Sequence, residues 1–147
     1  MKKYVYFSPI IVVCILIFSF YTPNSSTIES EKGVQFFKGN FKEARILAQK
    51  EKKLIFIDFY ATWCGSCKKL QAKTLSTETV GNYLNKNYIN LAVDVDTDDG
   101  GAMAQFYKIT ALPTLMVLDE NGKIVRQSVG YQNKHSLLQF ANLNTTP

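Results

Sequence analysis

The feature that most constrains the fold is an apolar run, LIFIDFY at residues 54–60, that ends close to two cysteines, Cys64 and Cys67. Such a run is typical of a strand that is buried on both faces, in a sheet covered by helices. The stretch from Cys64 to about Lys73 has a helical pattern. We therefore expect the cysteines where a central strand ends and a helix begins.

The rest of the chain alternates between strand-like and helix-like segments. The expected strands are residues 34–37, 88–95, 114–119 and 123–129, the expected helices are 41–52 (capped by Asn40), 76–87, 102–107 and 134–142, and 96–101 is a turn. Asn121-Gly122, between the last two strands, is a strong hairpin signal. This order predicts an α/β fold, with a central mixed β-sheet flanked by helices on both faces, parallel before the hairpin and antiparallel after it.

An uncharged apolar segment, residues 4–21, follows Met1-Lys2-Lys3. As a helix it would be about 27 Å long, near the lower limit for crossing a bilayer. A basic start before an apolar run is typical of a signal peptide or an N-terminal membrane anchor. We therefore expect 1–22 to be one of these two, 23–32 to be a polar linker and 33–147 to be the folded domain. No clear cleavage motif follows the run, so cleavage and retention both stay open.

Either outcome predicts a domain outside the cytoplasm, in the periplasm or cell envelope, because Lys2 and Lys3 would stay on the cytoplasmic side. Cys14 lies within the apolar run and lacks the small preceding residue of a lipidated cysteine, so we interpret it as a packing residue. The formal net charge is only +5 and the positive residues are scattered. We therefore expect no nucleic-acid partner.

Three interpretations of Cys64 and Cys67 are a metal site, a structural disulfide and a redox pair. Zinc needs at least three protein ligands, but there is one CxxC motif and one histidine, His135, in the last expected helix. A disulfide that closes so short a loop removes little entropy from the unfolded chain. Redox chemistry is therefore favoured, and no metal or cofactor is expected.

The start of a helix suits this chemistry, because its free N–H groups and partial positive charge stabilise a thiolate. Cys64 is then the acidic, attacking sulfur. Cys67, one turn later and more buried, would resolve the mixed disulfide by attacking Cys64. Gly65 and Ser66 form the tight turn between them.

Asp58 is the one charged residue of the apolar strand. Burial of an unpaired carboxylate is costly, so the pKa of Asp58 should be raised. A carboxyl group near the end of the strand could take the proton of Cys67 when that sulfur attacks. The alternative is a carboxylate that points to solvent or caps a neighbouring group.

Pro113 directly precedes an expected buried strand in the sequence TALPTLMV. A cis Leu112–Pro113 bond would bring this backbone beside the cysteines and leave the polar groups of Leu112 free to pair with an extended peptide. A trans turn proline is the alternative, but the nearby CxxC motif favours the cis form.

Together, FIDFYATWCGSCK, TALPT and the Asn-Gly hairpin resemble the thioredoxin family over about residues 34–142. The resemblance implies that Cys64 is the nucleophile, Cys67 the resolving cysteine, Asp58 the buried acid and Pro113 the cis-proline. It also places Trp63 at the substrate surface, which we expect to include Gly65, Ser66, Leu112 and Pro113 as well.

The sequence departs from the family pattern at two places. Gly-Ser stands between the cysteines where thioredoxins usually have Gly-Pro, so the family's redox potential cannot be transferred. Ala92 stands where the family often has a lysine near the buried acid. The stretch CKKLQAKTLSTETVGNYL is similar to exported thioredoxin-like domains related to the C-terminal domain of the thiol reductase DsbD.

The sequence therefore predicts an exported thiol–disulfide oxidoreductase that reduces protein disulfides, with electrons from a membrane thiol reductase. The alternatives are a disulfide oxidant or isomerase, a thiol reductase for cytochrome c maturation, and a binding module that uses the fold without catalysis.

Overall fold

The computed structural model describes residues 33–143, and the expectations for residues 1–22 and 23–32 lie outside them. Within the described part no helix is long and apolar enough to cross a membrane. The helices are α2 Phe41–Glu51, α3 Gly65–Leu70, the π-helical η1 Gln71–Leu75, α4 Glu78–Asn87, α5 Asp98–Phe106 and α6 Lys134–Ala141; the strands are β1 Leu54–Tyr60, β2 Tyr88–Asp94, β3 Thr114–Leu118 and β4 Ile124–Val129.

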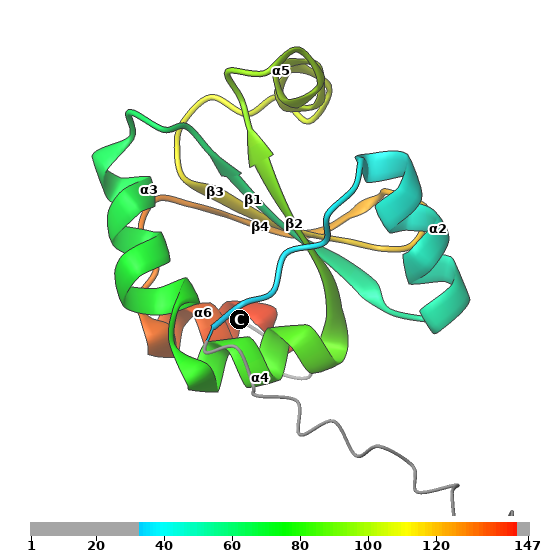
Figure 1. Ribbon diagram of the computed structural model, residues 1–147, viewed down its shortest axis with the longest axis horizontal. Helices are drawn as coiled ribbons and strands as arrows, with labels where there is room; N and C mark the ends of the chain where they lie inside the picture. The colour runs from blue at the N-terminus through cyan, green and yellow to red at the C-terminus, as the bar shows by residue number, and fades with distance from the viewer. Residues whose placement is uncertain (1–32, 144–147) are drawn as a thin grey trace, which may run out of the picture. The chain divides into compact units, whose positions relative to one another are not determined.

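The described strands form one mixed sheet in the order β2-β1-β3-β4 (Figure 1). β1 pairs in parallel with β2 and antiparallel with β3, and β3 pairs antiparallel with β4. The hairpin turns at Asn121-Gly122, where Gly122 has φ +87°, a conformation that glycine adopts without strain. The predicted α/β class, the mixed sheet and its strand directions are confirmed.

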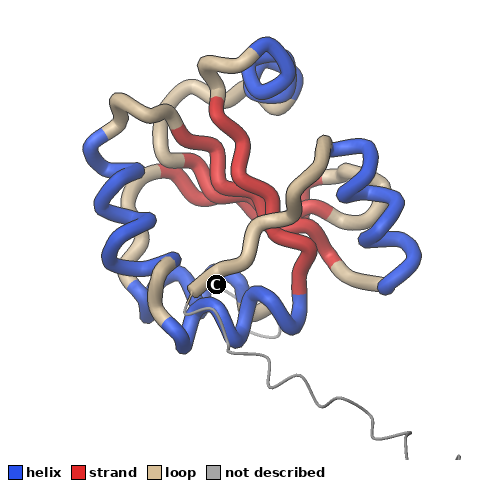
Figure 2. Tube along the Cα trace, in the orientation of Figure 1, coloured by secondary structure: helices blue, strands red, loops and turns tan. Residues whose placement is uncertain are grey.

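Helices cover both faces of this sheet (Figure 2). On one face Ile55, Ile57 and Phe59 pack in a cluster with Ala44 and Ala48 of α2. On the other face Phe56 belongs to a cluster formed with α3, α4 and α6. Side chains of a strand alternate between its two faces, so the apolar run of β1 is explained by burial on both sides.

The strand predicted at residues 34–37 is absent, and the segment has no regular structure. Its backbone makes two bonds to other backbone groups, from Val34 N–H to Leu75 C=O (2.7 Å) and from Phe37 N–H to Asn90 C=O (2.8 Å). The Gln35 backbone bonds only to side chains: its N–H donates to Asn85 Oδ1, and its carbonyl accepts from Asn90 Nδ2. The segment is therefore bonded to β2 at a single residue, Asn90, after which the chain continues to α2. An apolar tetrapeptide has strand character locally, but a strand also needs a partner along its length.

Helix α5 begins at Asp98 rather than near residue 102. Thr97 caps it by accepting the Gly100 N–H at 3.1 Å. Gly100, one of the two glycines that suggested a turn, has a packing role instead: a Cβ there would lie 1.9 Å from the Asp94 carbonyl oxygen. The helix therefore starts against the end of β2, at a distance that only glycine permits.

Gly81 of α4 has a similar role toward the segment before α2. A Cβ at Gly81 would lie 2.2 Å from the carbonyl oxygen of Gly33. We predict that Gly81→Ala releases this segment and lowers the free energy of unfolding by about 1–3 kcal/mol, in spite of alanine's better helix propensity. Hydrogen exchange should then show lost protection at the Val34 and Phe37 amides.

The matched control is Gly65→Ala, where an added Cβ meets nothing within 4 Å. This variant should leave the Val34 and Phe37 amides protected. Unchanged protection in Gly81→Ala would contradict the prediction.

Candidate functional site

The two cysteines lie where β1 gives way to α3. After Tyr60 the chain makes a short turn in which Cys64 N–H bonds to the Ala61 carbonyl at 3.1 Å. Cys64 has extended backbone angles (φ −76°, ψ 109°) and is the N-cap residue of α3, whose helical residues begin at Gly65. The predicted junction of strand and helix is therefore present.

Cys64 and Cys67 form a disulfide, with an Sγ–Sγ distance of 2.08 Å and a Cα–Cα distance of 5.3 Å. The Cys67 N–H donates to Cys64 Sγ at 3.1 Å. Cys64 keeps 5% of its surface exposed and Cys67 keeps 1%. Cys64 is therefore the more exposed of the two cysteines, although both are largely buried.

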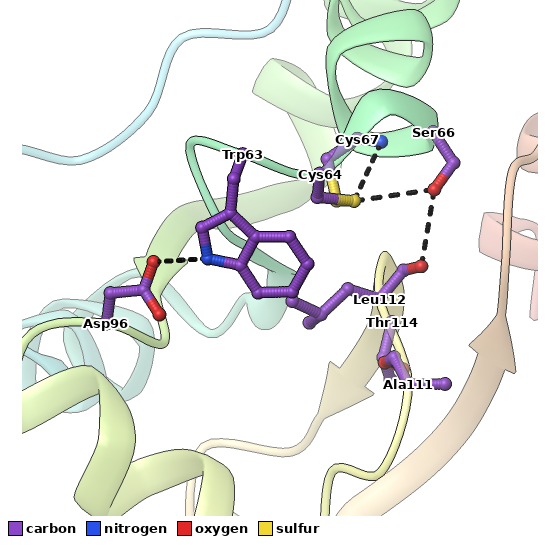
Figure 3. The surroundings of a disulfide bond; sticks show 8 residues. All are labelled: Trp63, Cys64, Ser66, Cys67, Asp96, Ala111, Leu112 and Thr114. Atoms are coloured by element: carbon purple, nitrogen blue, oxygen red, sulfur yellow. Dashed lines mark hydrogen bonds between the residues drawn. A yellow bond between two sulfur atoms is a disulfide. The ribbon is translucent and has the colours of Figure 1, made fainter.

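Ser66 connects Cys64 to the loop before β3 (Figure 3). Its Oγ lies 3.4 Å from Cys64 Sγ. The same Oγ donates to the Leu112 carbonyl at 3.3 Å, across 46 residues of sequence. The Leu112 carbonyl, expected to be free for a peptide, thus already has a donor in this state.

The Leu112–Pro113 peptide bond is cis, as predicted. Thr114 Oγ1 donates to the Ala111 carbonyl at 2.8 Å, and the Gly130 N–H donates to the Pro113 carbonyl at 2.7 Å. These bonds hold the loop on both sides of the proline. Leu112 also packs against the cluster that contains both cysteines.

Trp63 is 69% exposed, the second most exposed of the large hydrophobic side chains in residues 33–143. Its Nε1–H donates to Asp96 Oδ2 at 2.8 Å (Figure 3). We did not predict a role for Asp96. The signal that could have found it is topology, because the parallel strands β1 and β2 bring Trp63 and Asp96 to the same end of the sheet.

A cleft of about 560 Å³ lies at this end of the sheet. Four of the predicted substrate residues and the first cysteine line it: Trp63, Gly65, Ser66, Leu112 and Cys64. The sequence analysis did not predict the rest of the lining, which is apolar except for one threonine: Val95, Ala104, Ile109, Thr110 and Ala111. These residues belong to α5 and its flanking loops, so only the tertiary fold brings them to the cysteines.

Asp58 is fully buried, and neither carboxylate oxygen has a hydrogen-bond partner. Burial raises the pKa of Asp58 to about 7. By alternation along β1 its side chain lies on the same face as Phe56, the face that α3 covers. Ala92 is its neighbour on β2 and Leu115 its neighbour on β3. At the position where the family often has a lysine, the neighbour of Asp58 is therefore the methyl group of Ala92.

A sequence model of the thioredoxin family, described as "Thioredoxin", matches residues 33–143. A thioredoxin-like protein of Synechocystis is 41% identical over 87 residues, which are 59% of this chain and 77% of that protein. The thioredoxin of Bacillus subtilis is 32% identical over 97 residues, covering 65% of this chain and 86% of its own.

Solved structures agree with these sequence matches. A putative disulphide-isomerase of Bacteroides thetaiotaomicron has a TM-score of 0.66 at 33% identity, covering 74% of this chain and 89% of its own. The C-terminal domain of DsbD from Neisseria meningitidis has a TM-score of 0.61 at 24% identity, covering 76% and 99%, and this likeness concerns the fold alone. The chain belongs to the thioredoxin family, and it is a thiol–disulfide oxidoreductase.

Proposed function

We propose that this protein reduces protein disulfides outside the cytoplasm through the dithiol form of Cys64 and Cys67. The observation that carries the proposal is the position of the pair: Cys64 lines an apolar cleft, whereas Cys67 lies behind it. A substrate sulfur can therefore reach the first cysteine, and the second is protected until exchange has begun.

In the reducing direction the Cys64 thiolate attacks one sulfur of the substrate disulfide. A mixed disulfide forms, and the other substrate sulfur leaves as a thiolate. Cys67 then attacks Cys64 Sγ, the second substrate sulfur leaves, and the Cys64–Cys67 disulfide remains. Two electrons have passed from the dithiol to the substrate.

Asp58 would accept the proton of Cys67 during the second step. A carboxyl group with a pKa of about 7 is present in both protonation states near neutral pH, which suits a general base. Trp63, Gly65, Ser66, Leu112 and Pro113 would contact the substrate around the sulfurs.

Names of relatives support two directions of electron flow. Relatives called thioredoxin, such as that of Chlamydia caviae at 36% identity, favour the reductant. The Bacteroides thetaiotaomicron protein called a putative disulphide-isomerase favours oxidation or isomerisation as the second candidate. The two activities use the same sulfur chemistry and differ in redox potential.

The potential of the Cys64–Cys67 couple separates these candidates. We predict a value below about −230 mV, at the reducing end of the range for such proteins, from equilibration with glutathione buffers followed by thiol alkylation. A value well above about −200 mV would instead assign the protein to the oxidants and isomerases.

The proposed location depends on the N-terminal sequence, in which Lys2 and Lys3 precede the uncharged residues 4–21. Export would leave the domain in need of electrons, which a membrane thiol reductase would supply. A fusion of residues 1–32 to alkaline phosphatase, which is active only after export, should be active in a bacterial host. An inactive fusion would argue for a cytoplasmic protein.

A further inference from the structure

We propose that Ser66 couples the redox state of the cysteines to peptide binding by donating its single proton either to the Leu112 carbonyl or to Cys64 Sγ. This inference rests on the proposed function, because the peptide is the disulfide substrate of that reaction. The two acceptors lie 3.3 Å and 3.4 Å from Ser66 Oγ (Figure 3).

In the oxidised protein the carbonyl is the favoured acceptor. The Cys64 sulfur carries no proton in the disulfide, so any bond with Ser66 must come from the serine hydroxyl. A neutral disulfide sulfur is a weak acceptor, whereas a backbone carbonyl is a strong one. The Ser66 hydroxyl therefore donates its hydrogen bond to the Leu112 carbonyl in the oxidised state.

Reduction reverses the preference, because Cys64 becomes a thiolate. A hydrogen bond to a charged acceptor is roughly twice as strong as one between neutral groups. The hydroxyl is already within range of the sulfur, so rotation about the Ser66 side chain is enough to redirect the proton. The Leu112 carbonyl is then released, in the redox state that has to bind a disulfide substrate.

The consequence is a difference in peptide affinity between the two states. An extended peptide can pair with the Leu112 carbonyl of the reduced protein. After turnover the Cys64–Cys67 disulfide has formed again, Ser66 returns to the carbonyl, and the product peptide loses a hydrogen bond. Ser66 thereby favours substrate binding before the exchange and product release after it.

The first test measures the pKa of Cys64 in the reduced full chain, from the pH dependence of its alkylation by iodoacetamide. Tandem mass spectrometry separates Cys64 from Cys67 and Cys14. Ser66→Ala should raise the pKa of Cys64 by about one unit, because it removes a charge-assisted hydrogen bond. Ser66→Thr keeps the hydroxyl and should restore the wild-type value. Ser136→Ala in α6 is the control for a serine distant from the cysteines.

The second test measures binding of a peptide without reactive cysteines, the S-methylated insulin B chain. Trp63, the chain's single tryptophan, reports binding by its fluorescence. At pH 8 the wild-type protein should bind the peptide about fivefold more tightly when reduced than when oxidised, as expected for one hydrogen bond. In Ser66→Ala the oxidised form should gain affinity, and the ratio should fall toward one.

An unchanged pKa of Cys64 in Ser66→Ala, or an equal ratio in wild type and variant, would overturn the inference. Neither result affects the proposed function, because insulin reduction by the wild-type protein is measured separately. Conversely, a wild-type protein without reductase activity would refute the function even if Ser66 alters the pKa.

Discussion

Replacing Cys64 with serine should reduce insulin disulfide reduction to the rate seen without protein. The hydroxyl of serine cannot form a mixed disulfide, so the covalent step is lost rather than slowed. The assay follows insulin precipitation with dithiothreitol as the electron source. Cys64→Ser should fold, because serine at an N-cap position retains an acceptor for the Cys67 N–H.

Cys67→Ser should lose turnover equally but for a different reason. Its Cys64 still attacks the substrate, and without the resolving sulfur the mixed disulfide persists. Non-reducing electrophoresis should show this variant in covalent complexes that dithiothreitol separates by reducing the mixed disulfide. Cys64→Ser should form no such complexes. The trapped proteins would identify the substrates, and a membrane thiol reductase among them would support the proposed source of electrons.

The outcome of Cys64→Ser also tests the binding-module alternative. A protein that uses the fold only as a scaffold would keep its biological role after this change. Complexes formed by Cys64→Ser but not by Cys67→Ser would reverse the assigned order of the two cysteines.

Local sequence signals were sufficient for much of the fold. The seven residues of β1 are bounded as predicted, since the apolar run ends where polar residues begin on both sides. Asn40 caps α2 with a complete capping box that includes Glu43, a signal contained within four residues. Asn121-Gly122 fixed the hairpin for the same reason.

Contacts between segments that are distant in the sequence could not be predicted from these local signals. The prediction of a strand at residues 34–37 was wrong because the local sequence does not show over what length the edge of β2 offers hydrogen-bond partners. The hydrogen bonds from Trp63 to Asp96 and from Ser66 to Leu112 join residues that are 33 and 46 positions apart in the sequence. The turn predicted at residues 96–101 was wrong because the role of Gly100 depends on its close approach to the Asp94 carbonyl, which the local sequence does not show.

Asp58→Asn should stabilise the protein at alkaline pH and leave it nearly unchanged in acid. The native pKa of Asp58 is about 7, against 3.8 for the ordinary group. Between these values the native state holds the proton and the unfolded state has released it, so the stability of the wild type falls by about 1.4 kcal/mol per pH unit as pH rises. Above pH 7 both states are ionised and the loss levels off, on the order of 4 kcal/mol.

Urea unfolding of the oxidised proteins at pH 4, 6 and 8 measures this difference. The variant should match the wild type at pH 4 and exceed it by about 2–4 kcal/mol at pH 8. Glu120→Gln, a change at an exposed turn, is the matched control and should show no such trend. A constant difference across pH would mean that Asp58 does not titrate in this range.

Ala92→Lys tests whether the missing positive charge sets this behaviour. Ala92 lies beside Asp58 in the register of β1 and β2, so an ammonium group there should stabilise the carboxylate and lower the pKa of Asp58. The pH at which stability levels off should move down accordingly.

Asp58→Asn should also slow the second exchange step by about a hundredfold, because it removes a general base. That result would show that the carboxyl group that weakens the fold is also the one that deprotonates Cys67. Its burial then has a functional reason, because a solvated aspartate would be too weak a base near neutral pH.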